Sequence, residues 1–472
     1  MSASPQHYEF IVIGGGSAGY AAARTAANDF DLKTAVIDGA DKLSGLCILR
    51  GCMPSKALIE SSNRSRDIRE AAEFGLISDV PQVDLPAIIQ RKNRLIDDFA
   101  SYRSEQLENG NFDLIRGSAS FVDEHSLQVQ LKDSDETITI TADTICIATG
   151  SHIDVIKLPG LTESGFLTSD DILEAESLPD SITVLGGGAI ALEMACYLEG
   201  IGKKVTIIQR SGQVLRGCDA DVAQALEAGM TSRGIKVHTG TGLRRVEIRD
   251  GKKVVHYEQA GQNKEVASDE ILYALGRAPN TQSLNLEAIG LEMRGRHIAA
   301  NSSMATSIAH IFTAGDVTGP HEIVHIAIEQ GEILAQNAAI LLGKSTKKTR
   351  HIDYRLKLYG VFSTPEVAWV GLTSDEAVNQ EIDFSCASYP FNDHGKSMIM
   401  NEMHGFVKLI KNNATDQIIG GVVVGPEAVD LIHEIVVAMH FKSTAAQLAA
   451  IPHYHPTLSE IWTYPAEELA EL

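Results

Sequence analysis

The chain has 472 residues, of which 44% are hydrophobic and 22% are charged. This is the composition of a globular protein and excludes a disordered or collagen-like chain. The 40 basic and 62 acidic residues give a formal net charge of −22. Because such a surface repels phosphate backbones, we expect no nucleic-acid partner. At about 150 residues per domain, the length predicts about three domains.

The sequence carries no sign of export or of membrane insertion. The stretch Met1–Glu9 lacks the basic and apolar regions of a secretory signal. The best candidate for a spanning helix, Ile182–Leu198, is interrupted by three glycines and by Glu193. We therefore expect a cytoplasmic protein without a membrane partner.

One motif occurs twice and predicts the architecture. The apolar run Phe10–Ile13 is typical of a strand, the turn Gly14–Gly19 follows it, and a helix is expected over Tyr20–Ala27. The same order returns from Ile182 onward, and each copy continues into a further apolar run. The repeat predicts two right-handed βαβ units with parallel strands, and hence an α/β fold with two doubly wound, Rossmann-like domains.

The texture of the sequence changes beyond about residue 346. Alternating apolar runs, Gly405–Ile410 and Ile418–Val424, precede the helical stretch Val429–His440. This pattern predicts a separate α+β domain at the C-terminus.

Both glycine turns have the pattern of a dinucleotide-binding site. The first glycine permits the turn, the second lets the backbone approach a pyrophosphate, and the third lets helix and strand pack closely. Free N–H groups at the start of each helix then face the phosphates. The candidate cofactor-binding residues of the two turns are Gly14, Gly16, Gly19, Gly186, Gly188 and Ala191.

The residues that end the second strand of each unit bear on the choice of nucleotide. In the first unit Asp38 can accept a hydrogen bond from a ribose 2′-OH. The equivalent residue of the second unit is Gln209, which does not repel a 2′-phosphate, and Arg210 and Arg216 can hold one. One expectation is therefore NADPH or relaxed specificity. The alternative is that the two arginines merely solubilise a loop.

Cys47 and Cys52 are the one close pair among six cysteines, and the other four are expected to be small buried hydrophobes. On an ideal helix, Cα atoms five residues apart lie about 8.6 Å from each other, whereas a disulfide needs roughly 4.4–6.8 Å. We therefore expect a distorted first turn, with Gly51 supplying the freedom. A helix start lowers thiolate pKa values, which predicts a labile, exchange-active disulfide.

A zinc site is disfavoured because no second Cys or His pair has ligand spacing, and we expect no metal. Electrons are expected to pass between a nicotinamide, a flavin and the cysteine pair, which exchanges with an external dithiol or disulfide.

At this point the sequence resembles a known family, the flavin-dependent pyridine nucleotide–disulfide oxidoreductases, and most of all its dihydrolipoamide dehydrogenase branch. The resemblance runs along essentially the whole chain. Seven ordered motifs carry it: Gly14-x-Gly16-x-x-Gly19, Cys47-x4-Cys52-x-Pro54-Ser55-Lys56, Ala148-Thr149-Gly150, Gly186-x-Gly188-x-x-Ala191 with Glu193, Gly276-Arg277-x-Pro279-Asn280, Ala314-Gly315-Asp316 and His455-Pro456-Thr457-x-x-Glu460.

The resemblance implies FAD in the first βαβ unit, NAD or NADP in the second, and a homodimer. It implies an FAD-binding domain over residues 1–155 with a return segment over 281–346, an NAD(P)-binding domain over 156–280 and a dimerisation domain over 347–472. Cofactor contacts outside the glycine turns are then expected from Asp38, Lys56, Thr149, Gly150, Arg210, Arg216, Gly276, Arg277 and Asp316.

The resemblance also implies roles near the flavin. Cys52 is expected to face the ring and Cys47 to exchange with substrate, and Lys56 is expected to pair with Glu193 beside the flavin. The C-terminal domain of one protomer is expected to complete the active site of its partner.

An acid–base pair is expected at the C-terminus. Thiol–disulfide exchange needs a proton acceptor near neutral pH, which suits histidine, and a carboxylate on the far ring nitrogen fixes the tautomer. The segment His453–Glu460 is interpreted as a loop entering a helix, with Pro456 in the first helical turn. The resemblance assigns the roles to His455 and Glu460.

The reactive loop departs from the family pattern. The usual Thr before the first cysteine is Leu46, and the usual Asn-Val between the cysteines is Leu49-Arg50. Arg50 can lower the thiolate pKa, bind an acidic substrate or pair with a neighbouring acid, and these alternatives stay open.

The leading hypothesis is electron exchange between NAD(P) and dihydrolipoamide or a similar small dithiol, which can be a lipoyl group on another protein. An NADPH-dependent reductase of another disulfide or of a metal ion is the rival enzyme. The rival outside enzymology is a flavin-bearing redox sensor without turnover.

Overall fold

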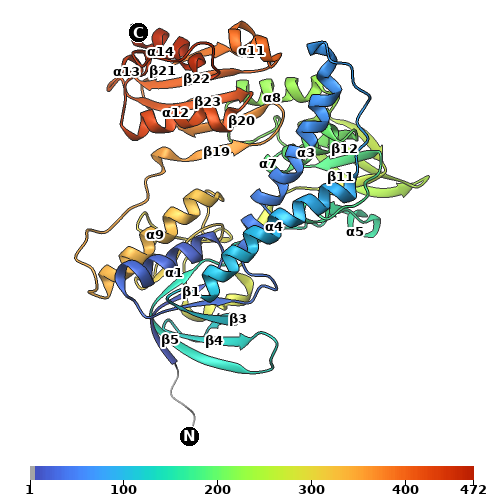
Figure 1. Cartoon of the computed structure of the whole chain (residues 1–472). Coiled ribbons are helices and arrows are strands. Elements are labelled where there is room, and N and C mark those ends of the chain that lie inside the picture. The colour runs from blue at the N-terminus through green and yellow to red at the C-terminus, as the bar shows by residue number, and fades with distance from the viewer. Residues whose placement is uncertain (1–5) are drawn as a thin grey trace. The chain divides into compact units, whose positions relative to one another are not determined.

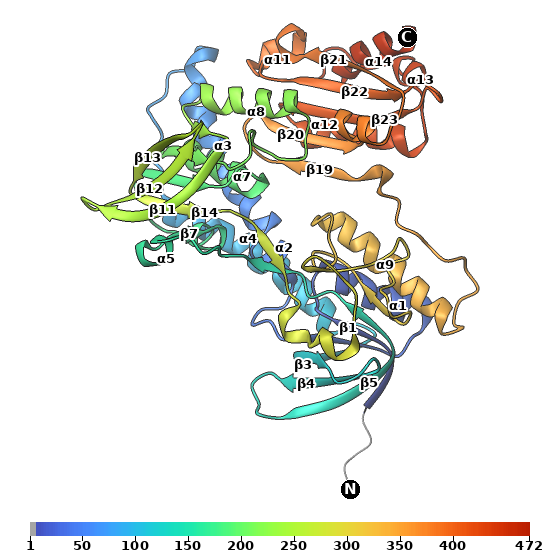
Figure 2. The same cartoon turned by 180° about the vertical axis from the view of Figure 1, so that it is seen from behind.

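A computed structural model describes residues 6–472. The chain divides into two compact units. Unit 1 comprises residues up to 54 together with 91–154 and 277–353, and unit 2 comprises 55–90, 155–276 and 354–472. Figures 1 and 2 show the elements from opposite sides.

Unit 1 is built on one six-stranded sheet. Its strands are β1 (Gln6–Ile13), β2 (Thr34–Asp38), β3 (Asp113–Phe121), β4 (Ser126–Leu131), β5 (Thr137–Ile147) and β18 (Ile311–Thr313). β1 pairs in parallel with β2 and β5, β2 with β3 and β5 with β18, whereas β4 runs antiparallel between β3 and β5. The second half of β1, Phe10–Ile13, is a continuous apolar run and fully buried, because both faces of the parallel part are covered.

Two helices of unit 1 pack closely against each other, as both views show (Figures 1 and 2). They are α1 (Ser17–Phe30) and α9 (Val324–Leu341). A methyl group on Gly331 would lie 2.3 Å from the carbonyl oxygen of Ala18, so only glycine permits this approach. The contact holds the start of α1, and hence the first glycine turn, against the segment that returns to unit 1.

Unit 2 contains a second parallel sheet, in the order β10-β9-β8-β14-β7. Its strands are β7 (Leu167–Thr168), β8 (Ser181–Leu185), β9 (Lys204–Ile208), β10 (Lys236–His238) and β14 (Glu270–Tyr273), and its helices are α7 (Ala189–Gly200) and α8 (Ala220–Ser232). A separate antiparallel sheet consists of β11 (Thr241–Arg249), β12 (Lys252–Gln259) and β13 (Gln262–Ser268).

The C-terminal part of unit 2 is an antiparallel sheet in the order β19-β20-β23-β22-β21, packed against α12. Its elements are β19 (Leu358–Val361), β20 (Glu366–Gly371), β21 (Phe384–Pro390), β22 (Phe406–Asn412), β23 (Ile418–Gly425), α12 (Ala428–His440) and α14 (Thr463–Glu471). One apolar core joins this sheet to the parallel sheet of unit 2, because Trp369 and Val422 pack in the same cluster as Val184 and Ile207.

Three α-helices lie between the second and third strands of the chain. They are α2 (Gly45–Leu49), α3 (Cys52–Glu70) and α4 (Leu85–Glu108). The shorter elements include α5 (Leu161–Ser164), α6 (Ser169–Ile172), α10 (Ser374–Asn379), α11 (Gly395–Met400), α13 (Ala445–Ala449), β6 (Ser151–Ile153), β15 (Arg277–Pro279), β16 (Met293–Arg294) and β17 (His297–Ile298).

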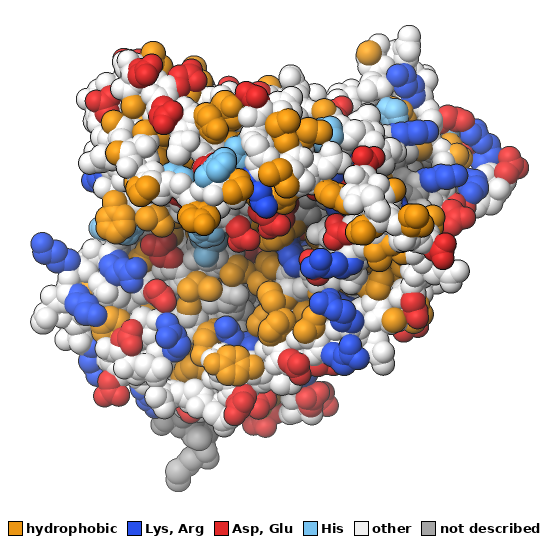
Figure 3. Space-filling model, turned by 45° about the horizontal axis from the view of Figure 1, so that its top comes forward, with side chains coloured by type: hydrophobic (Ala, Val, Ile, Leu, Met, Phe, Trp, Pro, Cys, Tyr) orange, Lys and Arg blue, Asp and Glu red, His pale blue; other side chains and the backbone are white. Residues whose placement is uncertain are grey.

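The predicted α/β fold with two βαβ units and a C-terminal α+β part is confirmed. Within residues 6–472, no helix is both long enough and apolar enough to cross a membrane. Acidic and basic side chains are interspersed over the face in Figure 3, with apolar side chains between them.

Candidate active site

The first glycine turn has the geometry of a phosphate cradle. Gly14 has φ of +105°, which only glycine adopts at low cost, and a methyl group on Gly19 would lie 1.8 Å from the carbonyl oxygen of Gly14. Gly16 caps α1 and no side chain accepts a hydrogen bond from the first turn of the helix. Those N–H groups and the positive end of the helix dipole therefore suit a diphosphate.

Asp38 stands beside this turn at the end of β2. Its Oδ2 accepts the N–H of Gly15 at 2.7 Å, and its Oδ1 accepts the N–H of Ala40 at 2.8 Å. The carboxylate is thereby oriented by the backbone. Each oxygen retains a second lone pair that a ribose hydroxyl can use.

The second turn repeats the first in unit 2. Gly186 has φ of +116°, and Gly188 caps α7 without a side-chain hydrogen bond. The third position is the fully buried Ala191, so here the helix and strand leave room for one methyl group. Arg210 and Arg216 follow β9 on the surface, and both side chains are exposed.

Two distant motifs of unit 1 meet through hydrogen bonds. Thr149 Oγ1 donates to the carbonyl oxygen of Asn280 at 2.7 Å, and the Asn280 N–H donates to the Gly150 carbonyl at 2.9 Å. Asp316 accepts Ser151 Oγ at 2.6 Å, and the Arg277 guanidinium binds the same serine. The structure thus brings Thr149, Gly150, Arg277 and Asp316 together. Gly276, with φ of +135°, directly precedes Arg277 at the end of a segment of unit 2.

Cys47 and Cys52 flank a break between two helices. Cys47 lies in α2, Arg50 leaves the helical region with φ of −143°, and α3 begins at Cys52. The predicted interruption of the helix is confirmed, but the reason given for Gly51 was wrong. Gly51 does not have a positive φ; instead, a Cβ there would lie 3.2 Å from the Cα of Cys47 and 3.1 Å from the Leu46 carbonyl oxygen. Glycine is favoured here because the chain folds back closely on Cys47.

The remaining cysteines divide into two groups. Cys146, Cys196 and Cys218 are buried as expected, and burial raises the pKa of Cys196 to about 11 and that of Cys218 to about 12. The expectation for Cys386 was wrong, because this residue is exposed. It lies on β21, which is an edge strand of the C-terminal sheet, where alternate side chains point outward.

Lys56 and Glu193 form a close ion pair within unit 2. Lys56 Nζ donates to both carboxylate oxygens of Glu193 at 2.8 Å, and only 7% of the Glu193 side chain is exposed. The N–H of Phe362 also donates to Glu193 Oε1 at 3.0 Å, and the ammonium lies 4.6 Å from the centre of the Phe362 ring. The buried Glu193 carboxylate accepts three hydrogen bonds and keeps Lys56, one helical turn after Cys52, in a fixed orientation.

The side chains of His455 and Glu460, called the dyad below, are in contact in the structure. His455 Nδ1 lies 2.9 Å from Glu460 Oε2, and the histidine side chain is 80% exposed whereas that of Glu460 is 13% exposed. This contact orients the ring and leaves Nε2 toward solvent, as a proton acceptor requires. The helical placement of Pro456 was wrong: the 3₁₀ turn begins at Ser459 and α14 at Thr463, because the loop continues past the proline.

His453 forms a second histidine–carboxylate pair. Its Nε2 lies 2.6 Å from Glu434 Oε1 and its Nδ1 lies 2.9 Å from the carbonyl oxygen of Ile451. Because both ring nitrogens have partners, His453 is not equivalent to His455 as a proton carrier.

Arg103 was missed by the sequence analysis. It lies on α4 with its guanidinium 4.0 Å above the ring of Tyr20. Burial lowers the pKa of Arg103, and the negative charges that Tyr20 and Cys47 can carry act against this. A cation is therefore within electrostatic range of Cys47. A single arginine on an amphipathic helix carries no motif that could have identified it.

Arg50 lies near Asp41. This favours pairing with a neighbouring acid over the two other roles considered for Arg50, which were lowering the thiolate pKa and binding an acidic substrate. The pKa of Asp41 is lowered mainly by its hydrogen bond to Lys132, and Arg50 contributes more weakly through its charge. Arg50 and Asp41 are therefore close enough to interact across the reactive loop.

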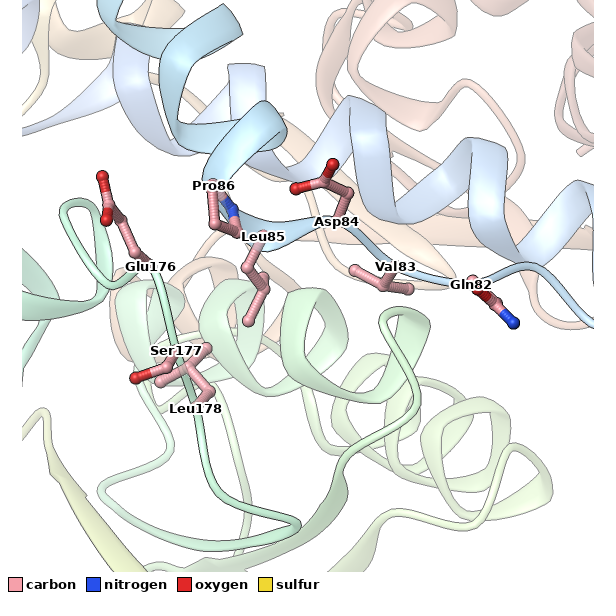
Figure 4. Close-up of a pocket in the computed structure, with 8 residues that line it drawn as sticks. All are labelled: Gln82, Val83, Asp84, Leu85, Pro86, Glu176, Ser177 and Leu178. Carbon is pink, nitrogen blue, oxygen red and sulfur yellow. The ribbon is translucent and has the colours of Figure 1, made fainter.

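Two cavities are lined by residues other than the two cysteines, the Lys56–Glu193 pair and the His455–Glu460 pair. One of about 490 Å³ is lined by Gln82, Val83, Asp84, Leu85, Pro86, Glu176, Ser177 and Leu178 (Figure 4). In it Asp84 caps the start of α4 through the N–H of Ala87. The other, of about 360 Å³, includes Glu434 and the segment Thr457–Ser459 beside the dyad. Among residues 6–472, no three His, Cys, Asp or Glu side chains are grouped to hold a metal ion.

Comparison with known proteins agrees with this geometry. Residues 8–331 match the model of the pyridine nucleotide-disulphide oxidoreductase family, and residues 359–466 match its dimerisation domain. A dihydrolipoyl dehydrogenase of Buchnera aphidicola subsp. Schizaphis graminum is 34% identical over 96% of this chain and 93% of its own. A mercuric reductase of Staphylococcus aureus is 31% identical over 93% of this chain and 78% of its own.

A solved structure is also similar along its whole length. It is a Cu(II) complex of the HOCl-induced flavoprotein disulfide reductase RclA from Escherichia coli, with a TM-score of 0.84, 26% identity and coverage of 98% of this chain and 99% of the other. The chain belongs to the pyridine nucleotide-disulphide oxidoreductase family, whose enzymes use FAD together with NAD(H) or NADP(H).

Proposed function

We propose that this oxidoreductase transfers electrons between a small dithiol of the dihydrolipoamide type and NAD(P), through a redox-active disulfide between Cys47 and Cys52. The observation that carries the proposal is the break between α2 and α3. There the backbone at Gly51 folds back onto Cys47, and Cys52 is the first residue of a 19-residue helix. This favours a thiolate at Cys52.

The exchange consists of two successive nucleophilic displacements at sulfur. His455 Nε2 takes the proton of one substrate thiol, and the resulting thiolate attacks Cys47 Sγ, breaking the Cys47–Cys52 bond and releasing Cys52 as a thiolate. The second substrate thiol loses its proton to water and attacks the substrate sulfur bound to Cys47. The bond between that sulfur and Cys47 breaks, and Cys47 leaves with the proton that His455 holds. The products are the substrate disulfide and a reduced cysteine pair that carries two electrons.

Bound FAD supplies the two-electron relay between a cysteine pair and a nicotinamide. Asp38 and the Gly14–Gly19 turn would hold its ribose and diphosphate, and the turn at Gly186 would hold the nicotinamide dinucleotide. Lys56, held by Glu193, would supply a positive charge to the flavin. Thr149, Gly150, Arg277 and Asp316 would supply hydrogen-bonding groups to the FAD site.

We propose a homodimer formed through the C-terminal domain, for which the match to a dimerisation domain at residues 359–466 is the support. In it, the C-terminal domain of one protomer brings the His455–Glu460 pair to the cysteines of its partner. We propose that the dithiol is a lipoyl group carried on another protein, for which the similarity to dihydrolipoyl dehydrogenases is the support.

The test uses the purified flavoprotein and three single cysteine variants. Cys47→Ser and Cys52→Ser are expected to abolish dihydrolipoamide-dependent reduction of NAD⁺ and NADP⁺ while FAD stays bound. Cys386→Ser is the matched control, because this exposed cysteine lies on an edge strand of the C-terminal sheet and belongs to none of the motifs, and it is expected to keep full turnover. Turnover by either of the first two variants contradicts the proposal.

A second candidate is an NADPH-dependent reductase of a metal ion or of another disulfide. Gln209, which leaves a 2′-phosphate unopposed, favours it, and so does the similarity to a mercuric reductase and to the RclA disulfide reductase. Rates with lipoamide, glutathione disulfide, Hg²⁺ and Cu²⁺, each with NADH and NADPH, separate the two candidates. Absence of turnover with all four acceptors indicates a redox sensor.

A further inference from the structure

Glu460 contacts a second histidine, His394, through the carboxylate oxygen that does not face His455. His394 lies between the 3₁₀ turn Phe391–Asp393 and α11, and its side chain is 0% exposed. Its Nε2 lies 3.5 Å from Glu460 Oε1, and within residues 6–472 this buried nitrogen makes no hydrogen bond. The other ring nitrogen, Nδ1, is 2.8 Å from the buried hydroxyl of Ser397.

The direction of these contacts follows from the chemistry of the groups. Burial lowers the pKa of His394, against the opposing charge of Glu460, so the ring is neutral and carries one N–H. A carboxylate can only accept, whereas a hydroxyl can donate. The proton therefore sits on Nε2, the ring nitrogen that lies 3.5 Å from Glu460 Oε1, and Ser397 Oγ donates to Nδ1.

We infer that His394 is a positioning residue of the acid–base pair: its Nε2 side faces one oxygen of Glu460 at 3.5 Å and stabilises that carboxylate electrostatically, so that the other oxygen stays on His455 Nδ1. The inference rests on the proposed function, because it assumes that His455 is the proton acceptor. Ser397, His394, Glu460 and His455 then form one row of polar contacts that ends at the exposed Nε2 of His455.

The surroundings of His394 contain few other ionisable groups. Tyr464 presents its ring edge-on, with centroids 6.4 Å apart, and it stacks on Tyr389, whose hydroxyl donates to Asp393. His455 acts on His394 from beyond Glu460. Glu460 is thus the one carboxylate that contacts the His394 ring among the described residues.

Removal of the His394 Nε2–H is expected to change the pH at which His455 accepts a proton. Without that donor the negative charge of Glu460 is less compensated, and it stabilises protonated His455 more strongly. His455 then becomes a base only at higher pH. The acidic limb of the kcat/KM profile for dithiol oxidation is expected to move upward by about 0.5–1 pH unit, a loss of roughly 3–10-fold on that limb.

The test compares pH profiles of kcat/KM for dihydrolipoamide oxidation in the FAD-loaded protein. His394→Leu has a similar volume and no donor, and it is expected to show the shift. In His394→Gln the side-chain amide can still donate to Glu460, and a profile close to that of the wild type is expected. His404→Leu, on an exposed residue of the following loop, is the matched control without a shift.

Failure of the role inferred for His394 and failure of the role proposed for His455 give different results. An unshifted profile in His394→Leu, or an equal shift in both His394 variants, overturns the inference and assigns His394 to packing alone. If His394→Leu does not fold, Ser397→Ala, which frees the ring tautomer, must show a smaller shift in the same direction. Near wild-type turnover of His455→Ala overturns the proposed role of the dyad itself. A severe loss in His455→Ala with no shift in the His394 variants overturns the positioning role of His394 alone.

Discussion

Asp38 and Gln209 occupy the same place in the two nucleotide turns. A Cβ on Gly15 would lie 2.9 Å from Asp38 Oδ2, and a Cβ on Gly187 would lie 3.0 Å from Cγ and Cδ of Gln209. Each side chain therefore covers the middle glycine of its own turn. The first βαβ unit carries a negative charge at this position, and the second does not. Only a negative charge there would repel a ribose 2′-phosphate.

Gln209→Glu is expected to turn the second unit toward NADH. A carboxylate at this position accepts the ribose 2′-OH and repels a 2′-phosphate, so the ratio of kcat/KM for NADH to that for NADPH should rise about tenfold or more. Steady-state kinetics with both nucleotides measures the ratio. Arg210→Leu is the companion variant and should weaken NADPH alone if the arginine binds phosphate. Equal losses with both nucleotides would assign Arg210 to the surface.

Replacement of Glu193 by Gln is expected to slow reduction of the flavin without loss of FAD. The amide oxygen can still accept the N–H of Phe362, but it no longer compensates the charge of Lys56, which then loses a fixed orientation. Stopped-flow measurement of flavin reduction by NADH should show a decrease of about tenfold or more. A wild-type rate in a variant with full flavin content would remove the pair from the proposed site.

Much of this organisation was predictable because it depends on local chemistry. Glycine at Gly14, Gly19 and Gly186 is demanded by backbone approaches that a Cβ would block, and the alternation of strand, turn and helix is visible in the residue pattern. The His455–Glu460 contact spans five residues, so sequence proximity and a motif were sufficient to expect it.

Contacts between distant segments were not predictable from pattern alone. Arg103 reaches Tyr20 from a helix more than 80 positions later, and His394 reaches Glu460 from a separate loop of the C-terminal sheet. Neither residue belongs to a motif. Both are brought to their places by the packing of whole elements, which periodicity does not encode. The role of Gly51 was misjudged for the same reason, because close approach to Cys47 becomes visible only when the break between α2 and α3 is built.

Lys408→Met is expected to destabilise unit 2 strongly. Lys408 lies on β22 with its side chain 6% exposed, and its Nζ donates to Asp219 at 2.6 Å and to Asp221 at 2.9 Å. Burial by itself raises the pKa of Asp219, but the hydrogen bond and charge of Lys408 lower it overall. Removal of the cation leaves a buried carboxylate unpaired, at a cost of about 3–5 kcal/mol.

Denaturant unfolding of the Lys408→Met variant measures this cost. Asp219→Asn combined with Lys408→Met should recover part of the lost stability, because the double variant buries no uncompensated charge. Losses that simply add in the double variant would show that the two side chains do not depend on each other.

Glu366→Gln is expected to remove a pH dependence of stability. Burial raises the pKa of Glu366 to about 7, against the hydrogen bond that its Oε2 accepts from the N–H of Val429 at 3.2 Å, and the charges of Glu427 and Asp430 raise the pKa further. In the unfolded chain the group titrates near 4.5. The folded protein therefore binds more protons between these two values, and its stability falls as the pH rises through that interval.

The amide of the Glu366→Gln variant keeps the acceptor for Val429 but carries no charge, so the variant should gain roughly 1–3 kcal/mol over wild type at pH 8 and nothing at pH 4. Unfolding free energies across pH 4–8 measure the difference, with the exposed Glu468→Gln as control. A gain that is constant across this range would contradict the titration of Glu366.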